Sequence, residues 1–189
     1  MGLVFQYGSN ASQARLLGPE RLNGHGAVIG RAATVEDYDI AFDVWSTTNR
    51  CSAADLVRSL GRKAWGVLYE IADDFISGER SDGQRTLAQI EGPNYEERRI
   101  TVRQADGDPV PAITFLVRSE KRAIGLFTRA RYLCWVVSGL REQGVPEPYV
   151  QHVIEIALET NRGGGAPGEE QNKLILALQA GWGVYTRCS

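Results

Sequence analysis

Apolar and polar residues alternate along much of the first two-thirds of the chain, a period typical of half-buried strands. The clearest case is 38–46, which places four large apolar side chains on one face: Tyr38, Ile40, Phe42 and Val44. The same pattern predicts further strands over 64–71, 99–103 and 112–118, with a short apolar strand at 3–5 and weaker candidates at 28–33 and 53–57. This part of the chain is therefore predicted to be mostly sheet.

The period becomes helical in the last third. Apolar residues recur at helical spacing over 133–140 and 150–158, on either side of the loop Gly144-Val145-Pro146. A run of three glycines, 163–165, then precedes a helical segment around 169–180, so 163–168 is the only obvious linker.

These boundaries predict one domain over residues 1–162. Residues 163–189 are expected to form a linker and a C-terminal helical extension. Its apolar Leu174, Ile175 and Leu178 favour docking on the same domain or on a partner subunit, which leaves a homo-oligomer open.

Size and charge narrow the function classes. The 189 residues contain 43% hydrophobic and 23% charged residues, as in ordinary globular proteins, and the formal net charge of -2 gives no field for nucleic acid. We therefore interpret the cluster of basic residues at 118–131 as a solvated face. The partner expected is a small molecule.

Location is predicted from missing signals and from cysteine use. No apolar run has the length of a membrane span, and no signal-peptide pattern opens the sequence, so we expect a cytoplasmic protein without membrane contact. The three cysteines Cys51, Cys134 and Cys188 are odd in number and far apart, which favours reduced thiols.

A strand-to-helix turn at Tyr7-Gly8-Ser9-Asn10 is the first chemical candidate. The apolar strand 3–5 leads into it, and Asn10-Ala11-Ser12-Gln13 has the pattern of a reciprocal helix cap. Such a turn exposes backbone N–H groups, which attract a carboxylate or a developing oxyanion. A plain helix cap uses the same donors.

Other catalytic patterns have little support. The two histidines, His25 and His152, lie at no ligand spacing from another His or Cys, so neither a metal nor another cofactor is expected. The nucleophile elbow Gly-x-Ser-x-Gly is absent, and the glycines near position 26 miss the dinucleotide spacing. Glu91 stands before Gly92-Pro93 at the predicted end of a helix, although most acids in a domain are simply solvated.

Several segments taken in order resemble the gamma-glutamylcyclotransferase-like family. They are Phe5-Gln6-Tyr7-Gly8-Ser9-Asn10, Trp65-Gly66-Val67-Leu68-Tyr69, Ile90-Glu91-Gly92 with Tyr95 after it, and Gly144-Val145-Pro146-Glu147-Pro148-Tyr149. The resemblance spans about residues 3–160, and the order of its elements makes it more specific than any one of them.

The resemblance implies an α+β fold, a small mixed or antiparallel β-barrel flanked by helices. It also implies a cofactor-independent enzyme that cleaves γ-glutamyl amides by cyclising the glutamyl part into 5-oxoproline. Glu91 matches the family's catalytic glutamate. The residues Tyr7, Gly8, Ser9, Asn10, Tyr95 and Tyr149 match positions on the substrate side.

The sequence departs from the family in three places. Ala88 stands where relatives often have an acid, the loop at 78–85 looks longer, and the tail beyond 162 has no clear counterpart. A non-catalytic small-molecule or partner-binding module on the same barrel therefore stays the alternative. An enzyme acting on glutathione is a third reading, which Ser9-Asn10 disfavours by family resemblance.

Overall fold

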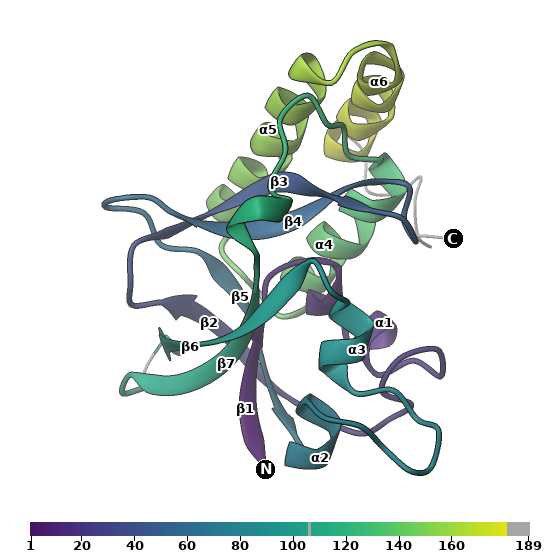
Figure 1. The fold of residues 1–189 in the computed structure, drawn as a ribbon. Helices are drawn as coiled ribbons and strands as arrows, with labels where there is room; N and C mark the ends of the chain where they lie inside the picture. Colours follow the sequence, from purple (N-terminus) through teal and green to yellow (C-terminus); the bar gives the residue numbers. More distant parts are fainter. Residues whose placement is uncertain (106, 181–189) are drawn as a thin grey trace.

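A closed five-stranded barrel forms the centre of the computed structural model, which describes residues 1–105 and 107–180, with side chains to 177 (Figure 1). Around the barrel the strand order is β1-β5-β2-β6-β7. The bounds are β1 Gly2–Gln6, β2 Ala27–Thr34, β5 Trp65–Ile71, β6 Tyr95–Arg103 and β7 Val110–Val117. All neighbours are antiparallel except β1 and β7, which are parallel and meet at Val4 and Ile113.

A hairpin of β3 (Tyr38–Ser46) and β4 (Cys51–Arg58) lies across one end of the barrel (Figure 1). The alternating pattern of β3 buries one face, as predicted, because every second residue points into the core. β4 is different, since its residues 51–56 are all buried, including the acidic Asp55. A strand buried on both faces must contact structure on both sides.

Helices cover the hairpin end of the barrel and one flank (Figure 1). Their bounds are α1 Gln13–Leu16, α2 Asp73–Ile76, α3 Leu87–Glu91, α4 Ala130–Glu142, α5 Glu147–Gly163 and α6 Ala166–Ala180, with single 3₁₀ turns η1 at Ser9–Ala11 and η2 at Ser119–Lys121. The apolar stripes of α4 and α5 are buried, as their spacing predicts.

The predicted fold class is confirmed: a small mixed barrel flanked by helices, with a helical C-terminal third. The predicted capping box at 10–13 is wrong, because α1 begins after Ser12 without any side-chain cap hydrogen bond. A capping box occurs at the start of α3 instead, between Thr86 and Gln89. The expectation of reduced thiols holds for Cys51, which is free, but is wrong for Cys134, which is disulfide-bonded.

The linker is shorter than expected, because α5 continues to Gly163 and α6 already begins at Ala166. α6 packs on the helices before it: Ile175 is fully buried, and the Gln171 side chain accepts a hydrogen bond from the Ala130 N–H, 3.0 Å away, at the start of α4. The described part of the extension thus contacts its own chain. The side chain of Leu178 lies outside the described residues, and the division into two domains stays a prediction.

Candidate active site

The loop after β1 and the end of α3 meet through one hydrogen bond. The side-chain amide of Asn10 donates to the Glu91 carboxylate, with 2.8 Å between Nδ2 and Oε1. Glu91 is the last residue of α3. The helix ends there because the next residue, Gly92, has a φ of 81°, which a residue with a side chain rarely adopts. The capping box at Thr86 fixes the other end of this short helix.

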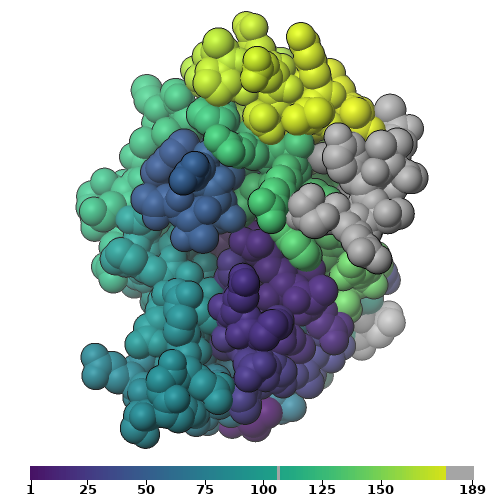
Figure 2. Space-filling model, turned by 90° about the vertical axis from the view of Figure 1, so that its right-hand side faces the viewer, coloured from purple at the N-terminus to yellow at the C-terminus, as the bar shows by residue number. Residues whose placement is uncertain are grey.

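A pocket of about 270 Å³ opens at this contact. Residues from five parts of the chain line it: Gln6, Tyr7, Gly8, Ser9 and Asn10 from β1 and its loop, Ala54 from β4, Glu91 and Tyr95 from α3 and β6, Phe115 from β7, and Tyr132 from α4. This volume includes space open to solvent, so the enclosed part of the pocket is much smaller and suits one small polar group rather than a large ligand. Figure 2 shows this side of the molecule, where the N-terminal segment in purple lies beside the teal segment that precedes β6.

Burial makes Glu91 a stronger base than a solvated carboxylate. Desolvation raises the pKa of its carboxyl, and hydrogen bonds from Asn10 and Gln6 together with the positive charges of Arg21 and Arg15 oppose that rise without cancelling it. A carboxyl group whose pKa lies nearer to neutral can both accept and return a proton. This is the property that an acid/base residue needs.

The loop beside Glu91 has hydrogen-bond donors and one acceptor that are unpaired within the described residues. Within the described residues, no protein group accepts a hydrogen bond from the backbone N–H of Gly8, Ser9 or Asn10. The Oδ1 atom of Asn10 is also buried without a hydrogen-bond partner. Buried polar groups rarely stay unpaired, so a ligand in the pocket is the natural partner for these atoms.

The hydroxyl groups of three tyrosines complete the wall of the pocket, and each is hydrogen-bonded to a backbone atom. Tyr7 donates to the Phe115 carbonyl at 2.5 Å, and Tyr95 donates to the Ala54 carbonyl at 3.0 Å. The hydroxyl of Tyr132 accepts a 2.9 Å hydrogen bond from the Ala54 N–H. Burial raises the pKa of all three phenols, that of Tyr132 to about 12. They stay protonated and act as hydrogen-bonding groups rather than bases.

Close backbone packing fixes the position of the loop. A Cβ atom on Gly139 of α4 would lie 2.2 Å from the Ser12 nitrogen, so only glycine lets α4 approach the chain that follows the loop. The Tyr69 hydroxyl, from β5, donates a 3.0 Å hydrogen bond to the Ala11 carbonyl. The loop is held from both sides before any ligand arrives.

The structure brings most of the residues expected at the site together. Tyr7, Gly8, Ser9, Asn10, Glu91 and Tyr95 all line the pocket. Tyr149 does not: it lies on α5, its ring is 6.2 Å from that of His152, and its hydroxyl is buried without a partner in the described residues. A role for Tyr149 in this pocket therefore has no geometric support.

Sequence reasoning missed four of the lining residues. Tyr132 looked like a core aromatic because it falls on the buried face of a helix. Gln6 is only 4% exposed although it is polar. A buried side-chain amide in an apolar strand needs a hydrogen-bond partner, but the sequence does not tell which group that partner is. Ala54 and Phe115 contribute backbone atoms, and because every residue type has these atoms, the sequence does not reveal their role.

Metal ligands are not clustered in this part of the molecule. Over residues 1–105 and 107–180, no group of three or more His, Cys, Asp or Glu side chains is arranged to hold a metal ion. In the same residues, no helix combines the length and the apolar character needed to cross a membrane.

Comparison with solved structures supplies the fold. A structure described as a gamma-glutamyl cyclotransferase superposes with a TM-score of 0.66 at 20% identity, covering 80% of this chain and 85% of its own. The chain has the gamma-glutamylcyclotransferase fold. An uncharacterized protein from Homo sapiens matches this fold equally well, with a TM-score of 0.66 at 19% identity over the same shares.

A third protein with this fold, YkqA from Bacillus subtilis, matches with a TM-score of 0.61 at 22% identity, covering 82% of this chain and 53% of its own. No protein-family model and no curated protein matches the sequence. At such low identity the gamma-glutamylcyclotransferase fold is established by shape alone. The chemistry must be argued from the pocket.

Proposed function

We propose that this protein is a cyclotransferase that cleaves a γ-glutamyl amide, releasing 5-oxoproline and a free amine, with Glu91 as the general acid and base. The observation that carries the proposal is the Asn10–Glu91 hydrogen bond, which places a carboxylate of raised pKa beside the unpaired N–H groups of the same loop. The reaction needs these two features side by side.

Glu91 would act on the α-amine of the glutamyl group. This amine is largely protonated near neutral pH and must lose a proton before it attacks the γ-carbonyl carbon. A new C–N bond then closes the five-membered ring, and the C–N bond to the leaving amine breaks. The ring nitrogen keeps one hydrogen, and the other two end on the leaving amine, passed through Glu91. The balance involves no water and no cofactor.

The loop would hold the glutamyl group while this happens. The free N–H groups of Gly8, Ser9 and Asn10 suit an oxygen that gains negative charge, and the unpaired Oδ1 of Asn10 suits an ammonium or amine hydrogen. Folding the substrate so that amine and carbonyl meet is a large part of the catalysis, since effective molarities of about 10⁵ to 10⁸ M are reached in oriented intramolecular reactions.

The tyrosines would keep the pocket small and dry. Tyr95 and Tyr132 bind the two backbone polar groups of Ala54, which fixes the hairpin edge over the pocket. The enclosed space is small, so the leaving amine would extend toward the mouth of the pocket. Exclusion of water strengthens each charge interaction inside.

A panel of γ-glutamyl amides assayed for 5-oxoproline tests the proposal. The wild-type protein is expected to convert at least one of them, and Glu91→Gln, which keeps the shape but removes the base, should lower kcat/KM at least about 100-fold. Glu97→Gln is a matched control, because Glu97 is exposed on β6 and lines no part of the pocket. Turnover kept by Glu91→Gln would remove Glu91 from the mechanism.

The same panel separates the other two readings. A binding module would bind a γ-glutamyl amide without releasing 5-oxoproline, in wild type and variant alike. An enzyme directed at glutathione would convert glutathione faster than the simpler amides. The geometry favours neither of these two readings. A base next to free donors is more than a binding module needs, and the pocket shows no feature specific for a cysteinyl-glycine group.

A further inference from the structure

Gln6 lines the pocket, yet the cyclisation mechanism gives it no part. It is the last residue of β1, and only 4% of its surface is exposed. The strand is fixed on both sides at this point. From β7, the Thr114 hydroxyl donates a 2.9 Å hydrogen bond to the Phe5 carbonyl. From β5, a Cβ atom on Gly66 would lie 2.5 Å from the Gln6 carbonyl oxygen, so only glycine lets the two strands approach this closely. The Gln6 side chain thus enters the pocket from a rigid strand.

The side-chain amide of Gln6 has a donor end and an acceptor end, and the protein occupies only the donor end. A carboxylate can only accept, so the hydrogen bond between Gln6 and Glu91 is donated by the Gln6 Nε2 atom. Within the described residues, no N–H or O–H group donates to the Gln6 Oε1 atom. Buried acceptors are rarely left unpaired, so a ligand in the pocket is the natural donor for this oxygen.

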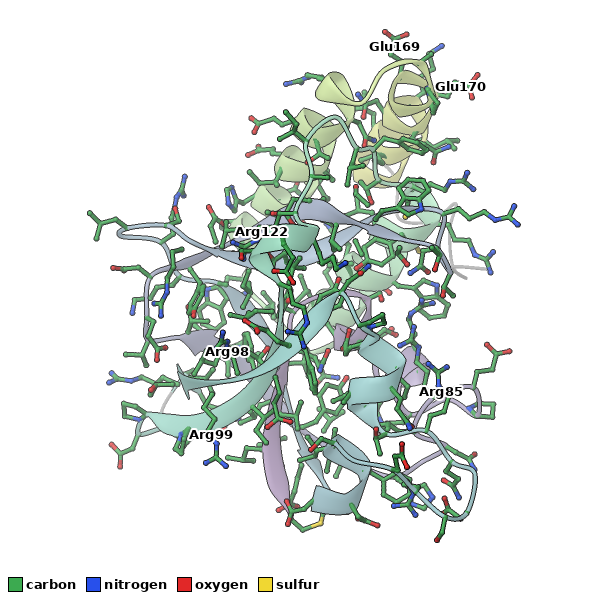
Figure 3. All side chains as sticks on the ribbon, viewed as in Figure 1. Arg85, Arg98, Arg99, Arg122, Glu169 and Glu170 are labelled. Carbon is green, nitrogen blue, oxygen red and sulfur yellow. The ribbon has the colours of Figure 1, made fainter. Side chains whose placement is uncertain are left out.

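The pocket gathers three acceptors and no positive charge. Gln6 and Asn10 each use their amide nitrogen on Glu91, and the carbonyl oxygen of each lacks a donor in the described part of the chain. Because the nitrogen and oxygen of an amide share one carbon, both free oxygens lie near the Glu91 carboxylate. Among the described residues, no Lys, Arg or His lines the pocket, and none of the arginines labelled in Figure 3 belongs to the lining. Such a site suits a cation with several N–H donors.

We infer that Gln6 is a substrate-binding residue, whose Oε1 atom accepts a hydrogen bond from the α-ammonium group of the glutamyl part, beside Glu91 and the Oδ1 atom of Asn10. The inference rests on the proposed function and deepens it by naming the substrate class: γ-glutamyl compounds with a primary, unsubstituted α-amine. An ammonium group has three N–H donors, one for each of the three acceptors. A methyl group on this nitrogen removes a donor and leaves an acceptor unpaired, which is unfavourable.

Glutamate and glutarate test this contact without turnover. The two ligands differ only in the ammonium group, and neither contains an amide to cleave. In titration calorimetry near pH 7, wild type should bind L-glutamate at least about 100-fold more tightly than glutarate. Gln6→Met keeps the length of the side chain but removes its polar atoms, and it should reduce this preference at least about tenfold by weakening glutamate alone. Leu3→Met, on the same strand but outside the pocket lining, should keep the wild-type preference.

Two further measurements separate direct binding from an effect through the charge of Glu91. Loss of the Gln6 donor also raises the pKa of the Glu91 carboxyl, and a protonated Glu91 would attract the ammonium less. Raising the pH restores the charge, so a preference that returns to the wild-type value near pH 8.5 would overturn the contact. Gln6→Glu keeps an acceptor oxygen at the same side-chain length and should retain at least the wild-type preference. A preference as weak as in Gln6→Met would count against the contact.

Turnover separates this inference from the cyclotransferase itself. Wild type should convert γ-glutamylglycine at least about tenfold better in kcat/KM than its α-N-methyl derivative, and in Gln6→Met this ratio should fall to about twofold or less. Equal losses on both substrates would assign Gln6 to Glu91 alone and overturn the contact. A glutamate preference that depends on Gln6, without 5-oxoproline from wild type, would support the contact and end the cyclotransferase proposal. Turnover with an unchanged ratio in Gln6→Met would keep the enzyme and overturn the contact, and so would failure of glutamate to bind.

Discussion

The Asn10 side-chain amide and the Glu91 carboxylate are hydrogen-bonded at 2.8 Å although 81 positions separate them in sequence. The loop residue holds the Oε1 atom of the carboxylate. It also opposes the rise of the Glu91 pKa that burial causes. Asn10 is therefore expected to set both the position of Glu91 and the pH at which it ionises.

Asn10→Asp should move the pH dependence of the reaction. The new carboxylate cannot donate to Glu91 and repels its negative charge, so the pKa of Glu91 rises further and the acidic limb of kcat/KM shifts to higher pH, by about one unit or more. The pH profile for 5-oxoproline release measures this. Asn23→Asp is the control, because Asn23 is exposed and Asp also tolerates its positive φ of 46°. An unmoved limb in Asn10→Asp would show that Glu91 does not govern it.

Tyr95→Phe and Tyr132→Phe should each destabilise the protein by about 1 to 2 kcal/mol. The first leaves the Ala54 carbonyl without a donor, and the second leaves the Ala54 N–H without an acceptor. Because both hydroxyls bind the same residue, the double variant should not be additive. Urea unfolding of the four proteins gives the coupling, and strictly additive losses would mean that the two hydrogen bonds are independent.

Asp43→Asn should stabilise the protein above neutral pH. Burial, followed by the charge of Asp55, raises the Asp43 pKa from 3.8 to about 6, so the folded state binds the proton more tightly than the unfolded state. Stability then falls as the pH rises from about 4 to 6, and the full loss is present above that window. At pH 7.5 the variant should gain about 1 to 3 kcal/mol.

Denaturant unfolding at two pH values checks the sign of this effect. Near pH 4 the gain from Asp43→Asn should largely vanish, because Asp43 is then protonated in the folded protein. Asp108→Asn, at an exposed position between β6 and β7, should change stability at neither pH. A gain at pH 4 as large as at pH 7.5 would contradict the linkage.

Gly139→Ala should be strongly destabilising, by about 3 kcal/mol or more, because its Cβ would lie 2.2 Å from the Ser12 nitrogen and 2.4 Å from the Ala11 carbonyl carbon. The melting temperature should drop by at least about 6 °C. Gly163→Ala is the matched helical control: nothing lies within 4 Å of its Cβ, and a change within about 1 kcal/mol is expected. Equal melting temperatures would mean that α4 can move away from the loop.

The sequence predicted the fold well where a pattern repeats. The alternation over 38–46 reproduces the bounds of β3, and helical spacing predicted α4 and α5 because each buries one stripe. β6 begins at Tyr95, four residues earlier than predicted, because barrel pairing with β7 extends it through polar residues. Strand pairing of this kind requires no alternation of apolar and polar residues, so it cannot be predicted from the sequence pattern.

The candidate site was harder to predict, because it depends on atoms that no motif specifies. Glu91 and the loop at 7–10 were found through their order along the chain, and their contact is a product of the fold. The backbone groups of Ala54 and Phe115 cannot be predicted from residue type, and Tyr132 looks like any buried helix aromatic. Tyr149, expected at the site from its position in the sequence, is not among the residues that line this pocket.

The most direct test of the central claim is the product formed from γ-glutamylglycine in H₂¹⁸O. Intramolecular attack by the α-amine predicts 5-oxoproline and glycine in equal amounts, without ¹⁸O in either product, and at least about 100-fold less of both with Glu91→Gln. Release of glutamate carrying ¹⁸O would show hydrolysis by water instead. That result, or 5-oxoproline formed equally well by Glu91→Gln, would contradict the account.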